Sequence, residues 1–222
     1  MEIKKGDVMI KIKMFSQNLY QMNTYLLYDE TGEGVLIDAG NSNEDELNEI
    51  IDFVEQEGIA LKKLLNTHGH IDHIIGNDAI IEKFGLKLYA HKAGLVFYET
   101  ISQHGSSLGF NIEKTHLPDV FLEDGDEVKF GNTTLNVLYT PGHADGSICF
   151  YSAEDQVVVV GDVLFQQSIG RTDLPTGDFD LLAESIRTKL YTLPPDTEVF
   201  PGHGPSTRIS YEKMDNPFVS GY

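Results

Sequence analysis

The stretch LLNTHGHIDHIIGND, residues 64–78, holds three of the chain's eight histidines within six positions. An apolar run precedes the motif HGHIDH at 68–73, and a segment with helical periodicity follows it. Gly69 permits a tight turn, so a loop between a strand and a helix can direct several side chains at one point beyond the end of the strand. Imidazole and carboxylate groups suit zinc, iron or manganese. The stretch therefore predicts a metal site.

Three distant segments repeat this construction of an apolar run, a glycine turn and a ligand-type residue. They are LYTPGHADGS at 138–147, VVVVGDVLF at 157–165 and VFPGHGPST at 199–207. In a layered α/β fold such strand ends gather at one edge, where sites usually form. Because packing alone does not require this repetition, it favours one shared site. The candidate metal ligands are His68, His70, Asp72, His73, His143, Asp162 and His203.

The cysteine count separates a structural metal site from a catalytic one. A structural zinc site is usually rich in cysteine, and this chain has only Cys149. A site of histidine and aspartate leaves positions to water, which is typical of catalytic metals. Cys149 lies in the apolar run SICFY, 147–151, and is predicted to be a buried, inert thiol.

Length and charge limit the classes of function. The 222 residues fit one large domain, 1–222. Sixteen basic and 35 acidic residues give a net charge of −19, which disfavours nucleic acid as a partner. No apolar run reaches the ~20 residues of a membrane span, and the start lacks the apolar core of a signal peptide. We therefore expect a cytoplasmic protein with no membrane partner; its oligomeric state is left unpredicted.

Apolar periodicity predicts two similar halves of sheet and helix. Helices are expected at 41–58, 74–85, 93–105 and from 178 to about 190, with the irregular region 92–118 inserted over one rim. The expected strands cover 9–15, 24–29, 34–40, 61–67, 86–91, 127–130, 133–140, 147–151, 156–162 and 197–203. Together they predict an α/β fold of two packed sheets flanked by helices.

The chain resembles a known family. THGHIDH, TPGHADGS, the GD at 161–162 and PGHG at 201–204 match, in order, the metallo-β-lactamase superfamily signature T-H-x-H-x-D-H…H…D…H. The resemblance implies a four-layer αββα sandwich. It also implies one metal held by His68, His70 and His143, a second held by Asp72, His73 and His203, and Asp162 as the bridge between them. The same resemblance implies that Asp38 lies beside the site. An equal interpretation of Asp38 is that it forms the turn at the end of a strand.

A closer resemblance is to the short bacterial hydroxyacylglutathione hydrolases (glyoxalase II). It rests on SIGRTDLPTGDFDLLAESI at 168–186, LPPDTEVFPGHGPSTRISYEK at 193–213 and NPF at 216–218. It implies a binuclear metallohydrolase that cleaves a thioester such as S-D-lactoylglutathione with a metal-bridging hydroxide. Two divalent ions are expected, with zinc as the first choice and iron or manganese as alternatives. Asp72 and Asp162 are the candidate catalytic residues.

The run GRTD at 170–173 also resembles persulfide dioxygenases, in which one Fe(II) would be held by His68, His143 and Asp162. The alternative function is therefore oxidation of glutathione persulfide. The candidate metal ligands are also compatible with a lactonase or a β-lactamase. A thioester substrate is favoured, because its thiolate leaving group, with a pKa near ~8.5, needs no general acid. A ribonuclease and a non-catalytic binding domain are disfavoured.

Recognition of an anionic glutathione conjugate would require basic residues. Arg171 and Arg208 are the candidate substrate-binding residues, and a surface arginine or a structural salt bridge is the competing interpretation for each. Only nineteen residues follow His203, so no separate C-terminal glutathione-binding domain is expected. We expect surface or loop positions for His91, His104 and His116. Core packing is favoured for most aromatic residues, with Phe110, Phe165, Tyr191 and Tyr211 as pocket candidates.

Overall fold

The computed structural model describes residues 10–105, 109–110 and 112–220. Two six-stranded sheets form its centre. The first has the order β1-β2-β3-β4-β5-β6, with antiparallel pairing from β1 to β3 and parallel pairing from β3 to β6. Its strands are Lys11–Gln17, Met22–Tyr28, Glu33–Ile37, Ala60–Leu65, Leu88–Ala90 and Val120–Phe121.

The second sheet has the order β14-β13-β10-β9-β8-β7, and only β10 and β13 run parallel. In chain order from β7 to β10 its strands are Glu127–Phe130, Thr133–Tyr139, Ile148–Ser152 and Val157–Gly161. The last two strands, β13 and β14, are Glu198–Pro201 and Thr207–Arg208. A separate short hairpin pairs β11, Leu164–Phe165, with β12, Ser168–Ile169.

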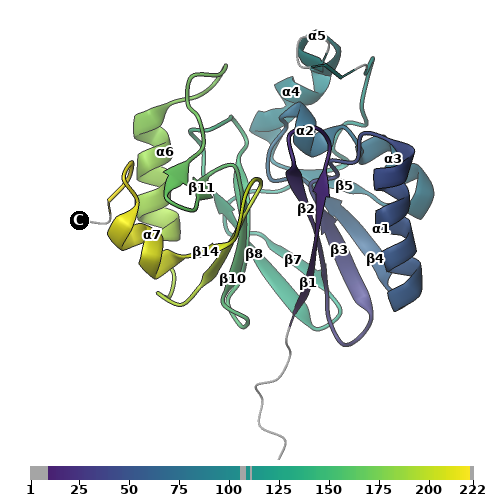
Figure 1. Ribbon diagram of the computed structural model, residues 1–222, viewed down its shortest axis with the longest axis horizontal. Coiled ribbons are helices and arrows are strands. Elements are labelled where there is room, and N and C mark those ends of the chain that lie inside the picture. Colours follow the sequence, from purple (N-terminus) through teal and green to yellow (C-terminus); the bar gives the residue numbers. More distant parts are fainter. Residues whose placement is uncertain (1–9, 106–108, 111, 221–222) are drawn as a thin grey trace, which may run out of the picture.

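Helices cover the outer face of each sheet. Figure 1 shows α1 and α3 on one side of the molecule and α6 and α7 on the other, with both sheets between them. The helices are α1 Glu44–Glu57, α2 Ile71–Ile74, α3 Asn77–Phe84, η1 Lys92–Gly94, α4 Leu95–Glu99, α5 Ile101–Gly105, α6 Phe179–Ser185, η3 Ile186–Leu190 and α7 Ile209–Asp215. No helix in these described ranges has the length and hydropathy to cross a membrane.

Helix α1 begins and ends where its sequence directs. Asn43 accepts a hydrogen bond from the backbone N–H of Glu46, and acidic residues occupy the first turn, where the helix dipole favours negative charge. Gly58 ends the helix in the left-handed conformation at φ 65°. Ile50 and Val54 face the first sheet and are buried.

Three apolar layers account for the four-layer architecture. One layer joins the first sheet to its helices through residues such as Leu36, Leu64 and Ile80. A second joins the two sheets. A third joins the second sheet to its own helices through residues such as Val160 and Leu182. Each sheet is thus covered on both faces, as the buried strands β2, β3 and β9 indicate. The predicted αββα sandwich is confirmed.

Several local predictions need correction. The expected helix at 93–105 is divided into η1, α4 and α5, and the chain leaves helical geometry at Thr100. The C-terminal helix α7 and strand β14 were not predicted. Residue 9, part of the expected first strand, and the side chain of His104 lie outside the described residues.

Candidate metal centre

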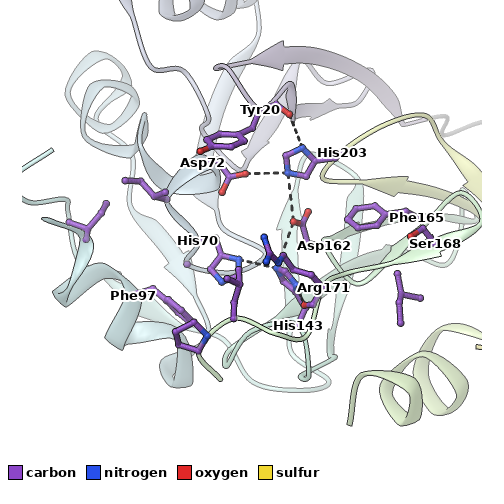
Figure 2. A pocket seen from close by; sticks show the side chains of 16 residues that line it. Tyr20, His70, Asp72, Phe97, His143, Asp162, Phe165, Ser168, Arg171 and His203 are labelled. Atoms are coloured by element: carbon purple, nitrogen blue, oxygen red, sulfur yellow. Dashed lines mark hydrogen bonds and ion pairs between the residues drawn. The ribbon is translucent and has the colours of Figure 1, made fainter. Parts of the chain in front are cut away.

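The ends of four strands meet at one edge of the sandwich. His68 follows β4, His143 follows β8, Asp162 follows β10 and His203 follows β13. The isolated bridge between Met22 and His203, with the hydrogen bond from the Asn23 N–H to the Gly202 carbonyl, joins the two sheets at this edge. Figure 2 shows the labelled residues of this edge facing a common space.

The first group of ligand-type atoms belongs to three histidines. His70 Nδ1 lies 3.0 Å from His68 Nε2 and 2.9 Å from His143 Nε2. His70 is the residue before the short helix α2, which places its ring opposite the other two. These three nitrogens come close enough together to bind one ion.

The second group combines one carboxylate with two imidazoles. Asp72 Oδ2 lies 3.2 Å from His203 Nε2 and 3.8 Å from His73 Nε2. Asp72 and His73 both come from α2, whereas His203 comes from the opposite sheet. This group too has the spacing of a metal site.

Asp162 lies between the two groups. Its Oδ1 is 3.3 Å from His73 Nε2, and its Oδ2 is 3.7 Å from both His143 Nε2 and His203 Nε2. One carboxylate therefore faces ligands of each group, as a bridging ligand would.

The other ring nitrogen of four histidines is held by an oxygen. Nδ1–H of His143 donates to the Arg171 carbonyl at 2.8 Å, and that of His203 donates to the Tyr20 carbonyl at 3.1 Å. Nδ1–H of His73 donates to Asp38 at 2.9 Å. Carbonyl and carboxylate oxygens only accept, so Nδ1 carries a proton and Nε2 is the ring nitrogen that faces the site.

His68 is fixed in the same way through Thr67. The Thr67 hydroxyl donates to Asp38 Oδ2 at 2.6 Å, so it accepts from His68 Nδ1–H at 3.1 Å. Asp38 also accepts from the Thr67 N–H at 2.7 Å. Asp38 therefore orients His68 through Thr67 and His73 directly, in addition to ending β3 in a left-handed conformation at φ 57°. Thr67 was not among the predicted site residues, although its place before the first histidine of the motif was a signal.

Electrostatics divide the histidines into two kinds. Burial lowers the pKa of His68 well below its ordinary value and that of His70 to about 3, so both are neutral. Burial also acts on His73, but Asp162, Asp72 and Asp38 outweigh it and raise its pKa well above the ordinary value. A proton on His73 thus compensates three converging carboxylates when no other cation does so.

The buried polar atoms fit a metal ion. His73 Nε2 and Asp162 Oδ1 are buried and have no hydrogen-bond partner among the described residues, because their mutual approach lacks hydrogen-bond geometry. A cation between them would satisfy both atoms. With a set of imidazole and carboxylate donors, the residues fit zinc, iron or manganese.

Glycine is required where other chain segments approach the site. A Cβ on Gly202 would collide with Asp162 Oδ1 and the ring of His73. A Cβ on Gly170 would collide with the Asp162 carbonyl and the ring of His143. The glycines before His203 and Arg171 thus allow close packing around Asp162.

A pocket of about 570 Å³ opens over both groups. Aromatic and aliphatic side chains provide most of the wall outside the ligand-type residues, so the pocket suits an organic substrate with apolar parts. These side chains are Tyr20, Ile71, Phe97, Ile101, Phe165, Ile169, Leu174 and Pro175.

The two candidate arginines differ in position. Arg171 lines the pocket, whereas Arg208 does not. In the antiparallel pair of β13 and β14, Arg208 faces Glu198, at the end of β13 opposite to the one that leads to His203. Arg208 therefore lies outside the pocket lining, because β14 carries the chain back along the sheet and away from the site.

The remaining predicted residues are distributed as follows. Cys149 is buried, and burial raises the pKa of its thiol to about 12, as expected of an inert cysteine. His91 stacks on Tyr139 and His116 pairs with Asp119. Of the four aromatic candidates only Phe165 lines the pocket; Phe110 and Tyr191 are buried in apolar clusters, and the Tyr211 hydroxyl accepts from Gln167.

Fold and site together define a class: αββα proteins with two adjacent His/Asp groups at one sheet edge. The chain matches the sequence model of the metallo-beta-lactamase superfamily over residues 18–203, and it belongs to this superfamily. It is 34% identical over 213 residues to the hydroxyacylglutathione hydrolase GloC of Haemophilus influenzae, which covers 95% of this chain and 99% of GloC. The predicted family is confirmed.

Two solved structures are similar over nearly the whole chain. The BLEG-1 B3 metallo-beta-lactamase is 37% identical with a TM-score of 0.87 and covers 95% of this chain and 100% of its own. TTHA1623 in a di-iron-bound form is 36% identical with a TM-score of 0.83 and covers 93% and 100%. GloC is a hydroxyacylglutathione hydrolase and BLEG-1 is a B3 metallo-beta-lactamase, so the fold alone does not specify the activity.

Proposed function

We propose that the protein hydrolyses thioesters at a centre of two divalent metal ions. The observation that carries the proposal is the position of Asp162, whose carboxylate oxygens lie 3.3–3.7 Å from Nε2 atoms of both ligand groups, His143 in one and His73 and His203 in the other. In the proposed centre His68, His70 and His143 hold one ion, Asp72, His73 and His203 hold the other, and Asp162 bridges them. Two such ions would act as Lewis acids that polarise a carbonyl and acidify a water molecule.

The chain's own residues supply position and surroundings. Asp38, Thr67 and the carbonyls of Arg171 and Tyr20 keep four Nε2 lone pairs directed at the centre. The apolar wall excludes water from the substrate, which strengthens electrostatic interactions inside the pocket.

The leaving group favours a thioester over an amide. A thiolate with a pKa near ~8.5 departs without protonation, whereas an amine does not. The similarity to GloC supports hydrolysis of a thioester, and S-D-lactoylglutathione is the first probe to test.

Metal analysis and activity assays on one preparation test the proposal. We expect two divalent ions per chain and hydrolysis of S-D-lactoylglutathione or of an uncharged lactoyl thioester. The same preparation is given glutathione persulfide in an oxygen electrode and a chromogenic β-lactam. A single tightly held iron with oxygen uptake on the persulfide would replace the proposal by a dioxygenase, and turnover of the β-lactam alone would replace it by a lactamase.

A further inference from the structure

One charged pair stands at the edge of the apolar pocket. Among the described residues that line the pocket, Arg171 is the one arginine or lysine. The loop that carries it continues into Leu174 and Pro175, which also line the pocket. Arg171 is therefore the one lysine or arginine of this lining that could contact a substrate carboxylate.

Asp173 already forms an ion pair with this arginine. Arg171 Nε donates to Asp173 Oδ1 and Nη2 donates to Oδ2, both at 2.7 Å, in a bidentate pair. Hydrogen bonding to Arg171 lowers the pKa of the Asp173 carboxyl to about 2, so the carboxyl is ionised at neutral pH. A second carboxylate can reach the Nη1 side of the guanidinium without displacing Asp173, but it then lies next to the negative charge of Asp173.

The glutathione arm of a thioester carries two carboxylates and one ammonium group, and the protein carries a net charge of −19. Arg171 and Asp173 are 60% and 69% exposed, so their pair adds little attraction for such an arm, and the apolar wall compensates poorly for carboxylates that enter the pocket. We infer that the pocket selects thioesters whose thiol arm carries no carboxylate, and that Asp173 sets this selectivity by neutralising Arg171. This inference rests on the proposed function and narrows its substrate class.

Binding of two uncleavable thioethers tests the selectivity. S-hexylglutathione and S-hexyl-N-acetylcysteamine share the alkyl group and differ in the carboxylates. Calorimetry on the metal-loaded protein should give the tighter Kd for the uncharged thioether. In Asp173→Asn, Kd for S-hexylglutathione should fall about threefold, with little change for the uncharged partner, because water screens an exposed ion pair.

Two further variants identify the cause of that gain. Arg171→Gln added to Asp173→Asn should abolish it, because the freed guanidinium is then missing. Glu55→Gln removes one negative charge from a surface ion pair with Lys83, 3.1 Å long, on a helix outside the pocket, and should produce no gain. An equal gain in Glu55→Gln would mean that net charge alone is responsible and would overturn the inference.

Hydrolysis separates failure of the inference from failure of the proposed function. The S-D-lactoyl thioesters of glutathione and of N-acetylcysteamine are compared by kcat/KM. A preference of the wild type for the glutathione ligand, or no selective gain in Asp173→Asn, overturns the inference even if thioesters are cleaved. If neither thioester is cleaved, the proposed function fails, while the calorimetric comparison still decides whether the pocket rejects carboxylates.

Discussion

Asp38 Oδ2 lies 2.9 Å from Nδ1 of His73, and both side chains are almost completely buried. The same oxygen accepts from the Thr67 hydroxyl at 2.6 Å. One carboxylate at the end of β3 therefore controls ring nitrogens in both proposed ligand groups, directly in His73 and through Thr67 in His68. Asp38 is a positioning residue that joins the two halves of the centre.

The variant Asp38→Asn tests this positioning role. Asparagine tolerates the left-handed backbone but replaces one oxygen of a carboxylate that accepts three hydrogen bonds with an amide donor. We expect metal affinity to fall about 10- to 100-fold, measured by competition with a chromophoric chelator. Asp29→Asn is the matched control, because Asp29 is also buried and also accepts from a threonine hydroxyl, but its hydrogen bonds come from Thr31, Asn132 and Thr133 and not from a histidine of the site. Unchanged affinity in Asp38→Asn would contradict the role.

Removal of the shared carboxylate should have a larger effect. In Asp162→Ala we expect loss of thioesterase activity by at least ~100-fold and fewer than two bound ions per chain, because both groups lose a ligand. Activity is measured by thiol release and metal content by mass spectrometry. A fully active variant that keeps both ions would exclude a bridging function for Asp162.

The sequence predicted the fold and the proposed ligand set because both depend on local patterns. Apolar runs followed by glycine turns defined the strand ends, and the layered architecture then placed His68, His143, Asp162 and His203 at one edge. The position of Arg208 depends instead on the register of β14 with β13. The short segment from His203 to Arg208 does not specify that register by its sequence alone.

The pairing of Arg171 with Asp173 could not be predicted either. Both residues were visible in the motif GRTD, but an arginine two positions from an aspartate can face a substrate or its neighbour with similar ease. The choice is made by the conformation of the loop. Helix α7 was missed because its seven residues show little periodicity, and tertiary contacts stabilise it.

The free energy of unfolding should depend on pH through Asp29, which lies away from the metal centre. Burial raises its pKa, but hydrogen bonds from Thr31, Asn132 and Thr133 outweigh burial and leave the pKa below its ordinary value. The folded state therefore binds this proton less readily than the unfolded state, whose pKa is ~3.9. The stabilisation is complete above that value and is lost as the pH falls through the folded pKa.

We expect Asp29→Asn to be less stable than the wild type by about 1–3 kcal/mol at pH 7, with a difference that narrows below about pH 4. Urea unfolding of the metal-free proteins at several pH values measures the difference, and the centre contributes equally to both. A difference that stays constant from pH 7 to pH 3 would mean that the charge of Asp29 does not stabilise the fold.

Glu212 of α7 holds one wall of the pocket. Its fully buried carboxylate accepts from the Gln167 N–H and from Asn216 Nδ2, each at 2.9 Å, and from Thr207 Oγ1 at 2.5 Å. Asn216 also donates to the Ser168 carbonyl at 3.0 Å. These bonds fasten the hairpin of β11 and β12, which presents Phe165 and Ile169 to the pocket.

In Glu212→Gln an amide donor replaces one acceptor oxygen, so at least one of these three donors loses its partner. We expect a loss of about 1–3 kcal/mol in unfolding free energy and faster amide hydrogen exchange over residues 164–169. KM for an apolar thioester should rise more than kcat falls, because the wall moves and the ligands do not. Glu184→Gln, at an exposed position of α6, is the control for loss of charge. Slow exchange retained in the hairpin of the Glu212 variant would show that β11 and β12 hold their place without α7.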